Sequence, residues 1–309
     1  MECENPGKKK VNKKLQAQLK DPDKIKAILK EVSFSFKLED GRDVTTLLIY
    51  LPVTDGAGPY VHFFEQIRSG ILQNFVFSSS EVEKKLGLES DDALEELFNK
   101  AVRKLSKHTA KGELGELILF TVLDVYFQAP KILSKVSMKS NPRMPVFGAD
   151  AVHGQFVGDH FRLYLGESKL HKDCTSAATS AADSIEKALG KYKDEFDLLD
   201  SYMDFPGIDE DIEGELLSLL NPFSETNDLY EIHSPCFIGF SSQKLIEEGH
   251  TNGDFELRYI ELAKAHISHF FTKVDGGQVG IDKTALMLLP FSCVEDLVEQ
   301  FVAYMGIEN

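Results

Sequence analysis

The stretch "FGADAVHGQFVGDHFRLYLGESKL", residues 147–170, contains two strand-like runs joined by a short turn. Alternate side chains of a strand point to the same face, so the apolar face of the second run continues into Glu167 and Lys169. The apolar members of that face are Phe161, Leu163 and Leu165. A buried carboxylate and a buried ammonium are costly unless they pair or bind a ligand. The pattern therefore has two readings, an ion pair at the end of a strand or a catalytic site.

A helix that is apolar almost all round precedes this hairpin. Its sequence, "GELGELILFTVLDVYF" at residues 112–127, places apolar side chains at helical spacing on both sides, which predicts a buried helix. Glu113 and Glu116 lie three residues apart and therefore occupy neighbouring positions on one face. Asp150 lies on the first expected strand of the hairpin and Glu167 on the second. We expect the helix to cross the apolar face of the second strand, so that three elements bring acids to one place.

The rest of the chain mixes helices and strands. Expected helices cover about 22–31, 59–73, 80–86, 91–107, 209–220 and 254–273, and expected strands cover 132–138, 146–153, 161–169 and 235–241. Intermixed elements of both kinds predict an α/β (α+β) fold with a mixed central sheet flanked by helices.

Composition narrows the class of protein. The four cysteines among 309 residues lie far apart with no CxxC pair, so neither a zinc site nor a disulfide framework is indicated. No apolar run approaches the roughly 20 residues that span a bilayer, and no apolar stretch follows the basic start. We therefore expect a cytoplasmic protein that does not enter a membrane.

The net charge of −16 is unevenly placed. Residues 194–261 hold 18 acidic against two basic residues, whereas the first 31 residues hold nine lysines. An acidic protein is not a typical nucleic-acid binder by itself. The acidic stretch is either a solvated surface or a surface that repels DNA and docks a basic partner.

Clustered carboxylates are the ligands of hard divalent cations such as Mg²⁺ or Mn²⁺. A cation held by Asp150, Glu167 and a helix carboxylate could lower the pKa of a bound water and stabilise charge on a phosphate. Glu116 is the preferred helix carboxylate, and Glu113 could share or replace it. The backbone carbonyl of Ser168 could be a further ligand.

At these residues the sequence resembles the PD-(D/E)xK nuclease superfamily, whose core is a helix, a hairpin and a helix in this order. It is more closely similar to the effector family of the Hachiman anti-phage defence system, HamA, through "GELGE", "GADAVH" and "YLGESKLH". The motifs cover roughly residues 110–190. The dipeptide Pro-Asp of the superfamily is absent because Ala149 precedes Asp150, and this does not alter the chemistry because Pro is not a ligand.

The resemblance implies roles for these residues. Asp150 and Glu167 would bind Mg²⁺, Lys169 would position the attacking water, and Glu116 would complete the catalytic site. It also implies a partner, a superfamily 2 helicase (HamB), which holds the nuclease inactive until DNA is engaged. Three regions are then expected: a basic arm and helix at 1–30, an N-terminal α/β region at 31–108, and a nuclease core with an acidic C-terminal portion at 109–309.

Basic side chains after the Glu-Ser-Lys strand are candidates for DNA contacts. They are His171, Lys172, Lys187 and Lys191. Solvated lysines are the ordinary alternative, and His153 is read mainly as a structural or rim residue. For the whole protein, the competing functions are a metal-dependent DNA nuclease in a defence complex, a catalytically silent scaffolding subunit of a helicase complex, and a hydrolase of another phosphoester.

Overall fold

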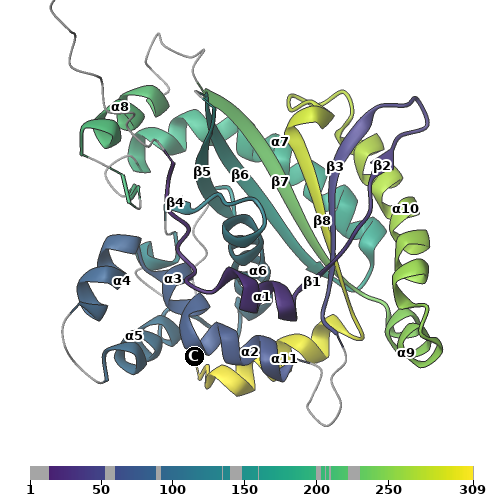
Figure 1. Ribbon diagram of the computed structural model, residues 1–309. Coiled ribbons are helices and arrows are strands. Elements are labelled where there is room, and N and C mark those ends of the chain that lie inside the picture. Colours follow the sequence, from purple (N-terminus) through teal and green to yellow (C-terminus); the bar gives the residue numbers. More distant parts are fainter. Residues whose placement is uncertain are drawn as a thin grey trace, which may run out of the picture.

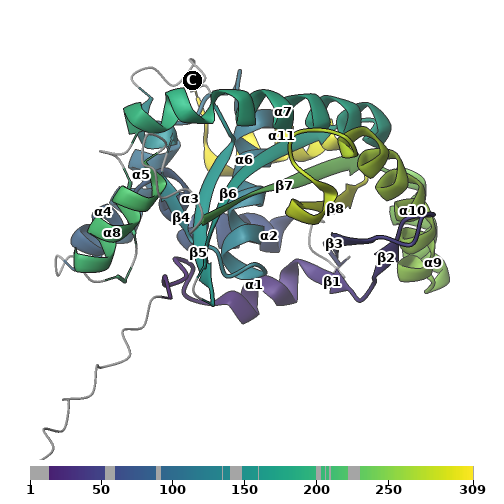
Figure 2. The ribbon, with the colours of Figure 1, turned by 90° about the horizontal axis from the view of Figure 1, so that it is seen from above.

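The computed structural model describes residues 14–52, 60–87, 92–133, 135–139, 148–158, 160–199, 203–205, 207–208, 210–221 and 230–308. Within this part of the chain, a mixed sheet has helices on both faces, as Figures 1 and 2 show. The expected α/β class is confirmed at this level. Residues 1–13 of the expected basic arm lie outside the described residues.

The sheet has the strand order β1-β3-β8-β7-β6-β5-β4, with β2 paired to β3. The strands are β1 Lys30–Val32, β2 Phe36–Lys37, β3 Asp43–Tyr50, β4 Lys131–Leu133, β5 Ala151–Val157, β6 His160–His171, β7 Tyr230–Ser241 and β8 Thr284–Phe291. Strands β3, β8, β7 and β6 run parallel, and β5 and β4 follow antiparallel. Because β3 of the region 31–108 pairs with β8 near the C-terminus, both ends of the chain contribute to one sheet. The division at residue 108 stays a prediction.

The helices lie before, between and after these strands. They are α1 Pro22–Ile28, α2 Val61–Gln66, α3 Leu72–Val76, α4 Ser79–Leu86, α5 Ala93–Val102, α6 Ala110–Val125, α7 Cys174–Leu199, α8 Glu210–Leu220, α9 Gln243–Asn252, α10 Phe255–Val274 and α11 Val294–Met305. Shorter turns are η1 Ile67–Ile71, η2 Val136–Met138 and η5 Ile281–Lys283. No helix of the described residues is long and apolar enough to cross a membrane.

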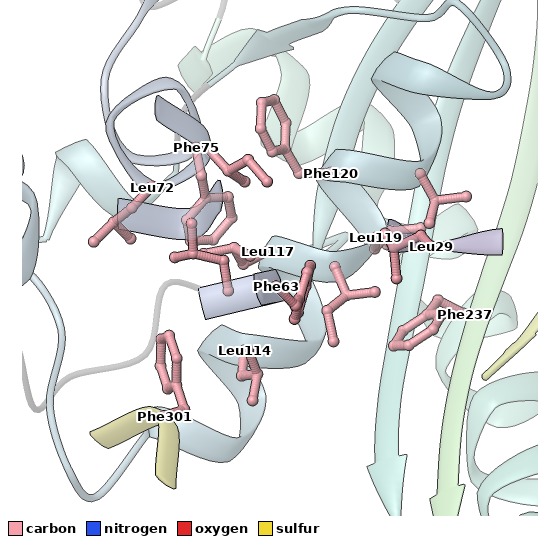
Figure 3. Packing of buried hydrophobic residues seen from close by; sticks show 14 of the residues in the cluster. Leu29, Phe63, Leu72, Phe75, Leu114, Leu117, Leu119, Phe120, Phe237 and Phe301 are labelled. Atoms are coloured by element: carbon pink, nitrogen blue, oxygen red, sulfur yellow. The ribbon is translucent and has the colours of Figure 1, made fainter. Parts of the chain in front are cut away.

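Helix α6 lies at the centre of the larger core, as its apolar surface predicts. Leu114, Leu117 and Phe120 pack among residues of α2, α3 and α11, while Leu119 lies towards Phe237 of the sheet (Figure 3). The opposite face of the sheet is covered by α7, α9 and α10, whose apolar residues form a second core with β3, β7 and β8. Figure 2 shows α7 on one side of the sheet and α1 on the other.

The hairpin of β5 and β6 confirms the strand expected at 161–169, and its turn uses Gly158 in the left-handed region (φ 65°). The first strand starts later than expected, at Ala151, so Asp150 stands immediately before β5. Residues 146–147 of that expectation lie outside the described residues. The strand expected at 132–138 is wrong beyond Leu133, since β5 provides no partner beyond Ala151 and the chain turns into η2.

The expected position of α6 is also wrong. Helix α6 lies on the face of β6 that carries Ser168 and Leu170, and Glu167 and Lys169 point to the other face, towards α7. The physical reason is steric. A β-carbon on Gly115 would stand 3.2 Å from Ser168 Oγ, so the glycine lets the helix approach the strand on that face.

Candidate active site

The candidate site forms at the first residue of β5, Ala151, where β6 runs on beyond its last β5 partner and stays paired with β7. Beyond Gly166, the edge of β6 has no strand partner from the β5 side among the described residues. Asp150 takes that place: its N–H donates to the Gly166 carbonyl at 2.9 Å, and its Oδ2 accepts from the Ser168 N–H at 2.8 Å and from Ser168 Oγ at 2.9 Å. The carboxylate of Asp150 is therefore fixed at the edge of the sheet, between its two faces.

Glu116 reaches this edge from α6. The helix can pack close to the sheet because Gly115 of α6 faces β6 and Gly166 of β6 faces α6. A β-carbon on Gly115 would meet Ser168, and one on Gly166 would stand 2.9 Å from Leu119 Cδ2. No hydrogen bond from the described residues reaches the Glu116 carboxylate. A cavity of about 190 Å³ lies beside it, lined by Thr109, Gly112, Glu113, Glu116, Lys135, Val136, Lys139, Ala149 and Asp150.

Glu167 approaches Asp150 from the opposite face. The Lys169 ammonium donates to Glu167 Oε1, and the Ser184 hydroxyl of α7 also bonds to this carboxylate. Glu167 is buried, whereas Lys169 is partly exposed. Asp150 thus lies between two carboxylates, one on each side of the sheet.

Burial raises the pKa of all three carboxyl groups, and the charge of Asp150 adds to the shift of the other two. Burial, followed by the charge of Asp150, raises the pKa of Glu116 to about 8 and that of Glu167 to about 7. Burial also raises the pKa of Asp150, although the Ser168 hydrogen bonds oppose the shift. Burial alone would lower the pKa of Lys169, but the charge and hydrogen bond of Glu167 raise it above its ordinary value. At neutral pH the site thus combines a firmly protonated lysine with carboxyl groups that resist ionisation.

Comparison with protein families identifies the chain. A family model described as HamA matches residues 23–305. The chain belongs to the HamA family. This family is part of the Hachiman anti-phage defence system. A comparison with curated proteins gave no match. The family resemblance read from the three short motifs is confirmed and extends over most of the chain.

The structure separates the two helix carboxylates of this HamA-family chain. Glu113 is 3 % exposed and is held by a Lys139 ion pair, the Thr109 hydroxyl at 2.7 Å and the Ser106 N–H at 3.2 Å. Glu116 has no such partners among the described residues and borders the cavity together with Asp150. Glu113 therefore has a structural ion pair, and Glu116 is the helix carboxylate that is available to a ligand.

Three functional candidates were missed by the sequence analysis. Lys135 and Lys139 are buried and line the cavity, and Ser184 bonds to Glu167. The signal for the lysines is present in the sequence, because Lys131, Lys135 and Lys139 recur every four residues within and on either side of the strand expected at 132–138. No sequence signal singles out Ser184 among the small residues of α7.

The candidate DNA contacts lie after the Glu-Ser-Lys segment. His171, Lys172 and Lys187 are exposed, and the Asp173 N–H donates to His171 Nδ1 at 3.0 Å. The side chain of Lys191 lies outside the described residues. None of the three described side chains bonds directly to Asp150, Glu116 or Glu167 in the contacts of the described residues.

The structural reading of His153 is supported by its surroundings. Its ring is buried, donates from Nδ1 to the Ala129 carbonyl at 2.7 Å and lies against Phe120. Burial lowers the pKa of His153 to about 3, so the imidazole is neutral at physiological pH.

A metal ion would find carboxylates here, but no ready-made ligand cluster. No group of three or more His, Cys, Asp or Glu side chains in the described residues is positioned to hold a metal ion. Asp150 instead forms one pair of neighbouring carboxylates with Glu116 and another with Glu167. This donor set fits Mg²⁺, which is commonly held by one or two carboxylates and keeps several waters.

A larger cavity, of about 700 Å³, lies between residues 16–21 and α2–α5 and is lined by none of the predicted site residues.

Proposed function

We propose that this HamA-family chain is a metal-dependent DNA nuclease of the PD-(D/E)xK type, the effector subunit of a Hachiman complex that a partner helicase holds in check. One observation carries the proposal: Glu116 from α6, Asp150 from the start of β5 and Glu167 from β6 converge at the edge of β6, where burial and the charge of Asp150 raise the pKa of both glutamates beside a charged lysine. Such an arrangement costs stability without a cation, and perturbed carboxyl groups of this kind mark functional sites.

The arrangement of elements supports the same assignment. Helix α6, the β5–β6 hairpin and helix α7 follow one another around the acids, which is the order that the superfamily resemblance leads us to expect. Membership of the HamA family supplies the context of anti-phage defence. The helicase partner and DNA as substrate come from that context.

Asp150 and Glu167 would hold Mg²⁺ or Mn²⁺, with the Ser168 carbonyl as a third donor. In a strand, the N–H and C=O of one residue point to the same side. Since the Ser168 N–H points to Asp150, its carbonyl also points away from β7 and towards the edge of β6 beside Asp150. Glu116 would hold waters of the cation or a second cation. A bound cation would supply a more acidic water and charge neutralisation at the phosphate.

Lys169 acts as a donor in this scheme. Its pKa is raised, so the side chain remains an ammonium and cannot accept a proton from water at neutral pH. It can orient the attacking water and stabilise negative charge on the phosphate. Glu167 holds the ammonium in place through their hydrogen bond.

Replacement of Glu167 by Gln and of Lys169 by Gln, separately, tests the proposal. Each change should reduce Mg²⁺-dependent plasmid degradation by about 10²-fold or more, because each removes a group that stabilises the transition state. Glu299→Gln, an exposed acid on α11, is the matched control and should cleave normally. Circular dichroism and urea unfolding verify that all three variants are folded. Cleavage at the unsubstituted rate by either site variant would overturn the assignment.

A silent scaffolding subunit is the second candidate, favoured by the lack of a three-ligand cluster among the described residues. In that case the unsubstituted chain would bind the helicase and would show no cleavage at saturating Mg²⁺ or Mn²⁺, with or without the helicase and DNA. Cleavage that depends on Glu167 excludes this alternative.

A further inference from the structure

Three buried lysines run alongside α6 at intervals of four residues. Each lysine interacts with an acid on that helix. The charge of Lys131 lowers the pKa of Asp124, and the charge of Lys135 lowers the pKa of Glu116. Lys139 forms an ion pair with Glu113. A buried ammonium is costly, so three in nine residues require a reason. The segment that carries them runs from β4 through η2.

The two outer lysines have structural partners. Lys131 Nζ contacts the carbonyls of Asn74, Phe75 and Phe77 at the end of α3, and burial lowers the pKa of Lys131 to about 7. The Lys139 ammonium pairs with Glu113, and the Lys139 carbonyl accepts from Lys104 Nζ at 3.0 Å. These contacts fix the segment at both ends and thereby position Lys135 between them.

Lys135 faces the candidate site. It is 8 % exposed and lines the 190 Å³ cavity together with Glu116 and Asp150, and it also lines a smaller cavity with the same two acids. Its charge lowers the pKa of both Glu116 and Asp150. Lys139 also acts on Glu116, but its ammonium is bound to Glu113.

The charge of the site shows what Lys135 contributes. When all groups are ionised, the acids Glu116, Asp150 and Glu167 outnumber Lys135 and Lys169 by one. A single divalent cation would change this net negative charge to a net positive charge of one, which complements the single negative charge of a phosphodiester. Without Lys135 the cation-loaded site would be neutral and would lose that attraction.

We propose that Lys135 is a second cationic substrate contact of the site, whose ammonium binds a nonbridging oxygen of the DNA phosphate from the α6 side of the sheet while Lys169 acts from the α7 side. This proposal rests on the nuclease function proposed above. In this arrangement the phosphate would lie in the cavity between α6 and η2.

The test compares Lys135→Gln with Lys107→Gln, an exposed lysine just before α6 that serves as the matched control. DNA affinity is measured on the full chain with Mg²⁺ in a Lys169→Gln background, so that the DNA stays intact. Lys135→Gln should weaken DNA binding by about tenfold to a hundredfold, the usual effect of one hydrogen bond to a charged group. It should also reduce the slope of log affinity against log salt by about one, as expected for one phosphate contact.

A second readout separates substrate binding from a structural role. Removing an ammonium beside carboxylates should leave Mn²⁺ affinity, measured by calorimetry, unchanged or higher. If Lys135→Gln loses Mn²⁺ binding as much as DNA binding, the proposed role of Lys135 is wrong. It is also wrong if Lys135→Gln binds DNA as tightly as the Lys107→Gln control. If Lys135→Gln does not fold, the ammonium NMR signal of Lys135, assigned with Lys135→Arg, should shift when DNA is added, and an unshifted signal would overturn the role. Absence of both cleavage and Mn²⁺ binding in the unsubstituted chain would instead overturn the nuclease proposal itself.

Discussion

Replacing Glu116 by Gln should stabilise the cation-free protein, and the gain should grow with pH. In the folded chain, burial and the charge of Asp150 raise the pKa of Glu116 to about 8 from an ordinary value of 4.5. Between these two values the folded chain keeps a proton that the unfolded chain has lost. The stability contributed by this group is therefore complete below about pH 4.5 and is lost as the pH rises to about 8.

The size of the effect follows from the same values. From 4.5 to pH 7 the difference is 2.5 pH units, and each unit corresponds to about 1.4 kcal/mol. Since Glu116 is partly exposed, solvent screening reduces the total to roughly 2 to 3 kcal/mol at pH 7. Glutamine resembles the protonated acid and does not titrate. Asp150 and Glu167 titrate in both the variant and the unsubstituted chain, so their contributions largely cancel in the difference between the two free energies of unfolding.

Urea unfolding with EDTA at pH 5, 6, 7 and 8.5 measures the difference between Glu116→Gln and the unsubstituted chain. The free energy of unfolding of the variant should exceed that of the unsubstituted chain by little at pH 5 and by roughly 2 to 3 kcal/mol at pH 7. Glu299→Gln should show no such pH dependence. A difference that stays constant from pH 5 to 8.5 would refute the electrostatic reasoning.

Three further predictions concern the same site and its surroundings. Mg²⁺ should bind more tightly as the pH rises to about 8 and should release protons on binding. Calorimetry in buffers of different ionisation enthalpy measures this proton release. Binding without proton release would contradict the raised pKa values. Gly166→Ala should cost about 1 to 3 kcal/mol in urea unfolding, because its β-carbon would stand 2.9 Å from Leu119, whereas Gly112→Ala, with open space around it, should cost nothing. Neutralising four acids of the segment 209–213 (Asp209, Glu210, Asp211 and Glu213) should strengthen binding of the lone subunit to duplex DNA and weaken its binding to the helicase; unchanged behaviour in both assays would show that this cluster is only a solvated surface.

The sequence predicts the parts of the site better than their arrangement. The buried helix, the hairpin and the acids at positions 116, 150 and 167 follow from periodicity and local patterns. The face on which α6 packs could not follow from these patterns, because it depends on contacts between distant residues. Gly115 and Gly166 permit the close approach on that face, and a glycine in a helix or strand gives little indication of the neighbour that requires it.

The choice between Glu113 and Glu116 likewise needed the structure. Both lie on the same face of α6, three residues apart, and the difference comes from Lys139, which neutralises Glu113 from a segment far along the chain. Helix α9 was missed for a local reason, since its polar sequence "QKLIEEGHTN" has only two apolar residues. The strand predicted beyond Leu133 had suitable residues and finds no pairing partner in the described part of the chain, which a single sequence does not show.

The proposed nuclease requires a cation site at the edge of β6, and the position of a bound Mn²⁺ would reveal that site. Crystals of the full chain grown with Mn²⁺ and measured at the manganese absorption edge would locate the ion by anomalous scattering. We expect a peak between the carboxylates of Asp150 and Glu167, within about 2.3 Å of an oxygen from each, since Mn²⁺–oxygen bonds are close in length to those of the other hard divalent ions. A folded chain that binds no Mn²⁺ at saturating concentration, or binds it only away from both residues, would rule out the proposed cation site.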